Sequence, residues 1–168
     1  PRPFVWQNYP DAFTAVPFAR WFLNSLFIAT LVTIGQLCTC SLAGFTFARM
    51  QFPGRNILFL IYLGTIMIPL HVTIIPVFVM MNGLGLVDTF WPLIIPALVS
   101  AWGTFLFRQY FLTMPQELED AAKIDGSSFF RIYSQIFMPL AKPILATLGV
   151  FTFMGSWNDF LGPLIFLQ

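Results

Sequence analysis

The stretch between Arg20 and Arg49 contains no charged residue. A membrane-spanning helix needs about 20 mostly apolar residues, so this stretch is long enough to cross a bilayer. The composition agrees, since 58% of the 168 residues are hydrophobic and 9% are charged, whereas soluble domains carry about 25% charged residues. The sequence therefore predicts an all-α, polytopic membrane protein. Ser41, Ala43 and Gly44 predict a face on which a second helix packs closely.

Three further spans are predicted, which makes four spans in a single domain, residues 1–168. They cover about residues 56–81, residues 90–110, and a stretch that begins near Leu140 and runs through Gly155 and Pro163. Pro69 and Pro76 interrupt the second span, because proline removes a backbone donor and bends a helix. The chain starts at Pro1 and stops at Gln168 within an apolar run, so we expect it to be a piece of a longer protein.

The basic residues predict which ends of the spans face the cytoplasm. If the chain crosses the membrane four times, six basic residues fall on one side: Arg49, Arg55, Arg108, Lys123, Arg131 and Lys142. Arg2 and Arg20 fall on the other side. Loops rich in Lys and Arg face the cytoplasm, so the segment between the last two spans, residues 113–139, is predicted to be cytoplasmic.

This segment, called the 113–139 hairpin below, is predicted to form two short helices. Thr113 and Gln116 have the spacing of a capping box, so the first helix should begin near Met114. Asp125-Gly126 should end it, because glycine adopts the left-handed conformation of a helix stop without a Cβ clash. Ser127 can cap a second helix that runs towards Met138 and is closed by Pro139.

The charge of the hairpin indicates a protein partner. Leu118, Ala121, Ala122 and Asp125 share one stripe of the first helix, and Glu119 and Lys123 can pair on its other side. Residues 117–139 contain four acidic and two basic residues, a net charge of −2. A helix pair that lies on an anionic leaflet should instead be basic. The alternative is a solvated linker made of good helix formers.

A family resemblance rests on the same residues. Asp120-Ala121-Ala122, then Gly126, then Ile136, Met138 and Pro139, resemble the EAA signature of permease subunits of ATP-binding-cassette (ABC) importers, with Asp120 in place of Glu and Met138 in place of Leu. Residues 114–126 and 155–165 are similar to the maltose-type carbohydrate permeases. The resemblance implies six spans in the whole chain, one before residue 1 and one after residue 168. It also implies a location in a bacterial or archaeal plasma (inner) membrane.

The resemblance further implies the partners and the coupling residues. The 113–139 hairpin would form coupling helices that dock on a separate cytoplasmic ATPase dimer, which binds ATP and Mg²⁺. The residues that would contact or shape this interface are Glu117, Asp120, Ala121, Ala122, Asp125, Gly126, Ile136 and Pro139. A second homologous permease subunit, an extracytoplasmic solute-binding protein, membrane lipid and a small solute, most simply a sugar, complete the expected set.

Polar residues within the spans are candidates for the solute pathway. Trp157, Asn158 and Asp159 form the most polar part of any span, and an aromatic face beside amide and carboxylate groups suits a sugar. Trp102 and His71 are weaker candidates. The alternatives are packing or bonding within the bundle, and a position near the outer headgroups.

The chain contains no apparatus for catalysis. It has no G-x-x-x-x-G-K-[ST] loop, no H-E-x-x-H and no G-x-S-x-G. Cys38 and Cys40 are expected to be small, buried and reduced, and neither a metal nor a cofactor of its own is expected. No basic run suggests nucleic acid. A gradient-driven carrier or channel subunit, and a structural membrane subunit, remain alternatives.

Overall fold

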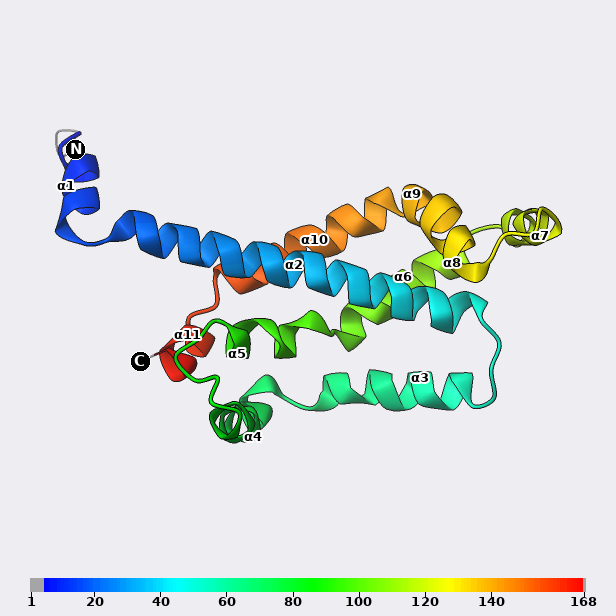
Figure 1. Cartoon of the computed structure of the whole chain (residues 1–168), viewed down its shortest axis with the longest axis horizontal. Helices are drawn as coiled ribbons and strands as arrows, with labels where there is room; N and C mark the ends of the chain where they lie inside the picture. Colours follow the sequence, from blue (N-terminus) through cyan, green and yellow to red (C-terminus); the bar gives the residue numbers. More distant parts are fainter. Residues whose placement is uncertain (1–4, 168) are drawn as a thin grey trace.

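The computed structural model describes residues 5–167, and the described part is helical, without a β-strand (Figure 1). Arg2 and its predicted side of the membrane lie outside the described residues. The longest helix, α2 (Phe18–Arg49), runs the length of the bundle and packs against α6 (Ala101–Leu112) and α10 (Lys142–Trp157). A short helix, α1 (Asn8–Ala15), precedes it at an angle. The predicted all-α fold is confirmed.

The second span is broken rather than kinked. It consists of α3 (Arg55–Gly64), a 3₁₀ turn (Thr65–Met67) and α4 (Leu70–Gly83), with a bend of 98° between the two parts. Ile68 is extended, as residues before proline are, and the chain turns there before Pro69 starts α4. Pro76 lies inside α4 without ending it. The predicted interruption of the span over residues 56–81 is therefore confirmed at Pro69 and wrong at Pro76.

The third span contains a local break in its helix, and side chains of α2 stabilise this break. It comprises α5 (Trp91–Ile94), a 3₁₀ turn (Pro96–Leu98) and α6. The break exposes two carbonyls, and α2 supplies donors for them: the Gln36 amide to Ala97 at 2.8 Å, and the Thr39 hydroxyl to Leu98. Ser100 then caps α6 by accepting from the Gly103 N–H at 3.1 Å. Irregular backbone at membrane depth needs such internal partners.

The last part of the chain follows the 113–139 hairpin. It contains α7 (Glu117–Ile124), α8 (Phe129–Ile132), a π-helical turn (Tyr133–Phe137), α9 (Met138–Leu140), α10, and α11 (Leu161–Phe166). The part ending at Leu140 and α10 differ in direction by 78°. Within residues 5–167, two helices are long and apolar enough to cross a membrane, and up to four spans result if each bent pair counts as one. The predicted fourth span ends at Trp157, and residues 158–160 separate it from α11.

Close helix contact occurs where the small residues of α2 predicted it. Ser41 and Gly44 are buried, and a Cβ added at Gly44 would lie 2.5 Å from the Cβ of Phe107 on α6. An aromatic cluster fills the adjoining core, with Phe45 against Phe111, Tyr133 and Phe137. The expectation of two buried cysteines is half wrong, because Cys40 is buried whereas Cys38 is exposed.

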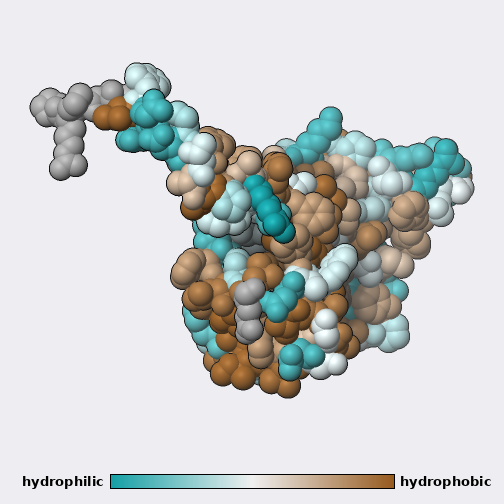
Figure 2. All heavy atoms as spheres, turned by 60° about the vertical axis from the view of Figure 1, so that its left-hand side comes forward, coloured by the Kyte–Doolittle hydropathy of each residue, from teal (hydrophilic) through white to brown (hydrophobic). Residues whose placement is uncertain are grey.

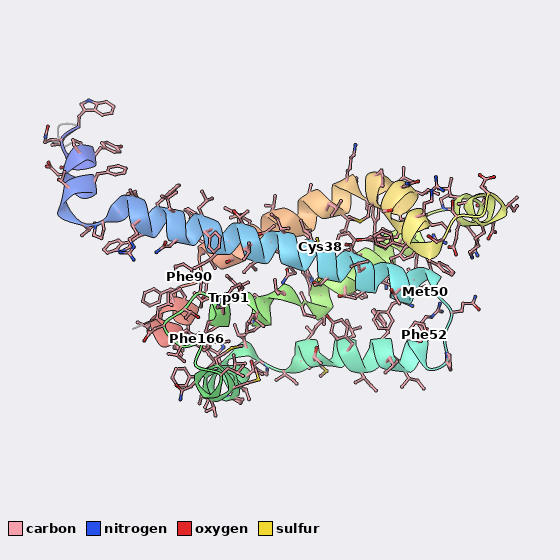
Figure 3. All side chains as sticks on the ribbon, in the orientation of Figure 1. Cys38, Met50, Phe52, Phe90, Trp91 and Phe166 are labelled. Atoms are coloured by element: carbon pink, nitrogen blue, oxygen red, sulfur yellow. The ribbon has the colours of Figure 1, made fainter. Side chains whose placement is uncertain are left out.

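The two ends of the bundle differ in chemistry. The α2–α3 turn and the hairpin lie at one end, and α1, α4 and α11 lie at the other (Figure 1). Met50 and Phe52 mark the hairpin end, whereas Phe90, Trp91 and Phe166 mark the opposite end (Figure 3). The predicted basic group gathers at the hairpin end. Much of the lower face in Figure 2 is hydrophobic, as a lipid-facing surface would be.

Candidate functional site

The first helix of the hairpin, α7, protrudes beyond the bundle (Figure 1). Of its residues, Glu119 and Ala122 are buried, and they form the face turned towards the bundle. The remaining residues of α7 are exposed, including Ile124 at 87%. A carboxylate, rather than a large apolar side chain, is therefore the main inward contact of α7.

Arg49, the last residue of α2, receives this carboxylate. Its Nη1 lies 3.7 Å from Glu119 Oε2, and the two side chains are 6% and 2% exposed. Its Nη2 donates to the carbonyls of Phe111 and Met114, both at 2.6 Å. Its guanidinium also lies over the Phe137 ring, 4.9 Å from the centroid. One arginine thus joins the ends of α2 and α6 to both halves of the hairpin.

The predicted pair of Glu119 and Lys123 is confirmed, with Lys123 Nζ 2.7 Å from Glu119 Oε1. Its predicted separation from Ala122, on the other side of the helix, is wrong for Glu119, because Glu119 and Ala122 are both buried on the face turned towards the bundle. Lys123 is partly exposed and lies over the Phe129 ring at 5.2 Å. Glu119 therefore bridges two cations, one inside the bundle and one at its surface.

The predicted helix starts are wrong, and the predicted stop is correct. α7 begins at Glu117 and has no side-chain cap, because the Thr113 hydroxyl donates back to the Tyr110 carbonyl at the end of α6. Gly126 has φ +76° and ends α7 in the left-handed conformation. Ser128, rather than Ser127, caps α8 by accepting from the Arg131 N–H at 3.4 Å.

The second half of the hairpin is buried more deeply than the first. Tyr133 and Phe137 lie in the core, and the Tyr133 hydroxyl is 2.8 Å from that of Ser41 on α2. Ile136 packs against this core and Pro139 is exposed. Pro139 does not close the helix as predicted, since it sits in the first turn of α9, and the chain turns at Ala141 instead. The π-helical turn that directly precedes Met138 interrupts the regular α-helical bonding pattern where Pro139 lacks its N–H.

The exposed residues of α7 form one surface at the tip of the hairpin. It combines apolar side chains with carboxylates: Glu117, Leu118, Asp120, Ala121, Ile124 and Asp125. Four of the eight predicted coupling residues, Glu117, Asp120, Ala121 and Asp125, therefore lie on one accessible face, whereas Ala122 points into the bundle. Such a surface can dock a protein groove with basic residues at its rim.

A cavity of about 420 Å³ lies at the opposite end of the bundle. It is enclosed by α4, the start of the third span and α11, with side chains that include Leu70, Thr73, Leu93 and Asp159. Its walls are mainly apolar, so Asp159 and Thr73 provide the polar side-chain groups. Asp159 also lines a smaller cavity of about 50 Å³ together with Ser25 and Trp157.

Trp157, Asn158 and Asp159 form the end of α10 and make local contacts. The Trp157 ring stacks on Phe153 at 5.7 Å and meets Phe22 of α2 edge-on at 5.4 Å. The Asn158 amide donates to the Met154 carbonyl at 2.8 Å, and Asp159 Oδ1 accepts from the Gly162 N–H at 3.2 Å. These bonds complete the helix ends, and each polar group keeps exposed surface.

The structure does not bring Trp102 and His71 to the same place as these residues. Trp102 lies on α6 with its ring edge-on to Phe151 at 5.8 Å, and it is partly exposed. His71 lies exposed in the first turn of α4, next to the cavity residue Leu70 but not in its wall. Among residues 5–167, no three His, Cys, Asp or Glu side chains are grouped as a metal site would require.

Sequence reasoning missed the role of Arg49 and the inward direction of Glu119. The signal for both is weak. Glu119 and Ala122 are three residues apart and so share a helix face, while Arg49 follows directly on an uncharged span. Neither pattern says that the two meet.

Comparisons with known proteins agree on one family. The family described as "Binding-protein-dependent transport system inner membrane component" matches residues 40–168. The chain is 37% identical, over 98% of its length, to the sn-glycerol-3-phosphate transport system permease protein UgpE of Yersinia pestis bv. Antiqua. It is 38% identical, over 100% of its length, to the arabinooligosaccharides transport system permease protein AraQ of Halalkalibacterium halodurans. It spans 61% of the length of each of these relatives.

A solved structure shares the fold. It is the crystal structure of a bacterial ABC transporter involved in the import of the acidic polysaccharide alginate. The TM-score is 0.80 at 26% identity, and the match covers 87% of this chain and 51% of that one. The similarity thus extends over most of the described helices.

Proposed function

The chain belongs to the family of binding-protein-dependent transport system inner membrane components, and from this we propose that it forms part of the permease subunit of an ATP-driven importer. The permease would span a bacterial or archaeal plasma (inner) membrane. ATP and Mg²⁺ would be bound by a separate cytoplasmic ATPase dimer, so this chain would carry no enzyme activity itself. A second homologous permease subunit and an extracytoplasmic solute-binding protein would complete the complex.

The observation that carries this proposal is the arrangement of α7. It protrudes at the end of the bundle that carries most of the cations, the end predicted to be cytoplasmic, and exposes Leu118, Ala121 and Ile124 among carboxylates. An exposed apolar patch with a charged rim indicates a binding surface. A docked ATPase dimer would move α7 when it closes on ATP, and the bundle would turn from inward-facing to outward-facing.

The solute we propose is a sugar or a related polyhydroxylated compound. The two relatives are named for glycerol-3-phosphate and arabinooligosaccharides, which both carry several hydroxyl groups. Trp157, Asn158 and Asp159, with Trp102 and His71 as further candidates, would line the pathway. The 420 Å³ cavity is mostly apolar, so a second permease subunit would supply many of the polar contacts that such a solute needs.

Photo-crosslinking in native membranes tests the proposal. Benzoylphenylalanine replaces Asp120 on the exposed face of α7 in the full-length protein, and Phe160, exposed at the opposite end, is the matched control position. We expect an adduct with an ATP-binding-cassette ATPase from position 120 and none from position 160. Adducts with lipid alone at position 120, or with an extracytoplasmic protein, would refute the proposal.

Transport measurements separate this function from a gradient-driven carrier or channel. Uptake into vesicles should require ATP on the hairpin side. It should stop when hydrolysis is blocked, even with an imposed ion gradient. Uptake that continues on the gradient alone would favour the alternative.

A further inference from the structure

The contact between Arg49 and Glu119 is looser than a buried ion pair normally is. The distance from Nη1 to Oε2 is 3.7 Å, whereas charge-assisted N–H···O bonds measure about 2.7–2.9 Å. Among the described residues, neither Arg49 Nε nor Glu119 Oε2 has a hydrogen-bond partner. Buried polar groups are nearly always bonded, so two unsatisfied atoms on facing side chains call for an explanation.

The arginine side of this contact is fixed. Its Nη2 is held by two carbonyls from the end of α6, and its guanidinium lies over Phe137 in the core. These partners come from elements that are themselves packed together, since the ring centroids of Phe111 and Phe137 are 5.6 Å apart. Arg49 therefore has little freedom to move towards Glu119.

The glutamate side is free to move, because α7 has few inward contacts. Besides Glu119, only the small side chain of Ala122 is buried on this helix. Lys123 holds the other carboxylate oxygen at 2.7 Å, so Oε2 stays directed at Arg49. A shift of α7 by about 1 Å would bring Arg49 Nη1 and Glu119 Oε2 to normal bonding distance and would give the unbonded carboxylate oxygen its partner.

We propose that Arg49 is a positioning residue that binds Glu119 tightly only when α7 is pressed towards the bundle, and so transmits the movement of the hairpin to the ends of α2 and α6. The inference rests on the proposed function, since it takes the docked ATPase as the source of the pressure. It assigns a mechanical role to a residue outside the docking surface.

The test measures solute transported per ATP hydrolysed by the complete transporter in vesicles. Glu119→Gln removes the charge at nearly constant shape. Arg49→Lys keeps the charge, but a single ammonium group cannot hold both α6 carbonyls and reach Glu119. Asp11→Asn, which replaces an exposed carboxylate on α1 at the opposite end of the bundle, is the matched control. We expect each inner variant to lower transport per ATP at least about fivefold, as for a lost allosteric coupling, and the control to match the unaltered protein.

Combining the two inner variants gives the sharper result. If both residues act through one contact, the double variant should transport about as much per ATP as either single variant. Two independent effects that multiply would overturn the proposal. A parallel loss of transport and ATP hydrolysis at an unchanged ratio would also overturn it, because that is the outcome of a merely structural role.

If the Glu119→Gln variant does not assemble into a transporter, a second variant takes its place in the test. Glu119→Asp keeps the buried charge but shortens the side chain, so it should assemble and still transport less per ATP. Transport per ATP equal to that of the unaltered protein would count against the proposal. The crosslink from position 120 tells the two proposals apart. Its absence refutes ATPase docking, whereas its presence together with unchanged coupling in the inner variants refutes only the role of Arg49.

Discussion

Replacing Gly44 with alanine should weaken the contact between the two central helices. The added Cβ would lie 2.5 Å from Phe107 Cβ and 3.0 Å from the backbone nitrogen of Arg108. Carbon atoms pack best at about 3.5–4.0 Å, so α2 and α6 would have to separate by about 1 Å at this point. Phe107 is fully buried and cannot move aside.

The cost follows from the kind of atoms involved. Backbone and Cβ atoms cannot rotate away, and overpacking of a well-packed interior costs about 1–3 kcal/mol. Gly149→Ala on α10 is the matched control, because its Cβ would meet Leu37 Cδ1 at an ordinary 3.7 Å. Both glycines lie inside membrane-spanning helices, so any gain in helix propensity is similar and largely cancels in the comparison.

The measurement is the free energy of unfolding in mixed micelles titrated with a denaturing detergent. Gly44→Ala should be less stable than Gly149→Ala by about 1–3 kcal/mol. Equal values for the two variants would show that α2 and α6 are not in close contact at Gly44, and would refute the packing described above.

Three further predictions concern the hairpin, its contact with α2, and Trp157 at the opposite end of the bundle. Gly126→Ala should cost about 1 kcal/mol through its left-handed backbone alone, since nothing lies within 4 Å of the added Cβ; hydrogen exchange in α7 should then be roughly fivefold faster, and unchanged exchange would contradict it. Ser41→Ala should lower the free energy of unfolding more than Tyr133→Phe, because it leaves the buried Tyr133 hydroxyl without a partner, whereas in Tyr133→Phe the Ser41 hydroxyl still donates to the Cys38 carbonyl. A larger loss of unfolding free energy in Tyr133→Phe would refute this. Trp157→Ala should weaken solute uptake, and an unchanged half-saturating concentration and rate would remove Trp157 from the pathway.

The parts of the fold that depend on local chemistry could be predicted from the sequence. The uncharged stretch after Arg20 predicted α2, and Gly126 predicted the stop of α7, because a membrane span and a left-handed turn each follow from residues next to one another. The small residues of α2 likewise predicted a close-packing face on this helix, although they did not identify α6 as its partner. Each of these features is decided within one segment.

Features for which the sequence allows two arrangements could not be predicted. Thr113 has the spacing of a helix cap, but its hydroxyl bonds to the end of α6 instead. Pro69 and Pro76 look alike in the sequence, yet the chain breaks only at Pro69, where Ile68 is extended. The pair of Glu119 and Lys123 fits a solvated surface as well as a buried one. Only the position of Arg49, which the sequence does not give, decides between them.

The polar groups at the two ends of the bundle find their hydrogen-bond partners differently. This difference determines where a movement of one helix is passed to another. At the end opposite the hairpin, Asn158 and Asp159 form their hydrogen bonds within three or four residues of themselves, so these bonds do not tie one element to another. At the hairpin end, Arg49 bonds to residues 62 and 65 positions away and pairs with α7. A displacement of α7 towards the bundle would shorten the 3.7 Å contact between Glu119 and Arg49. Because Arg49 is bonded to the carbonyls of Phe111 and Met114, the push would then act on the ends of α2 and α6 together.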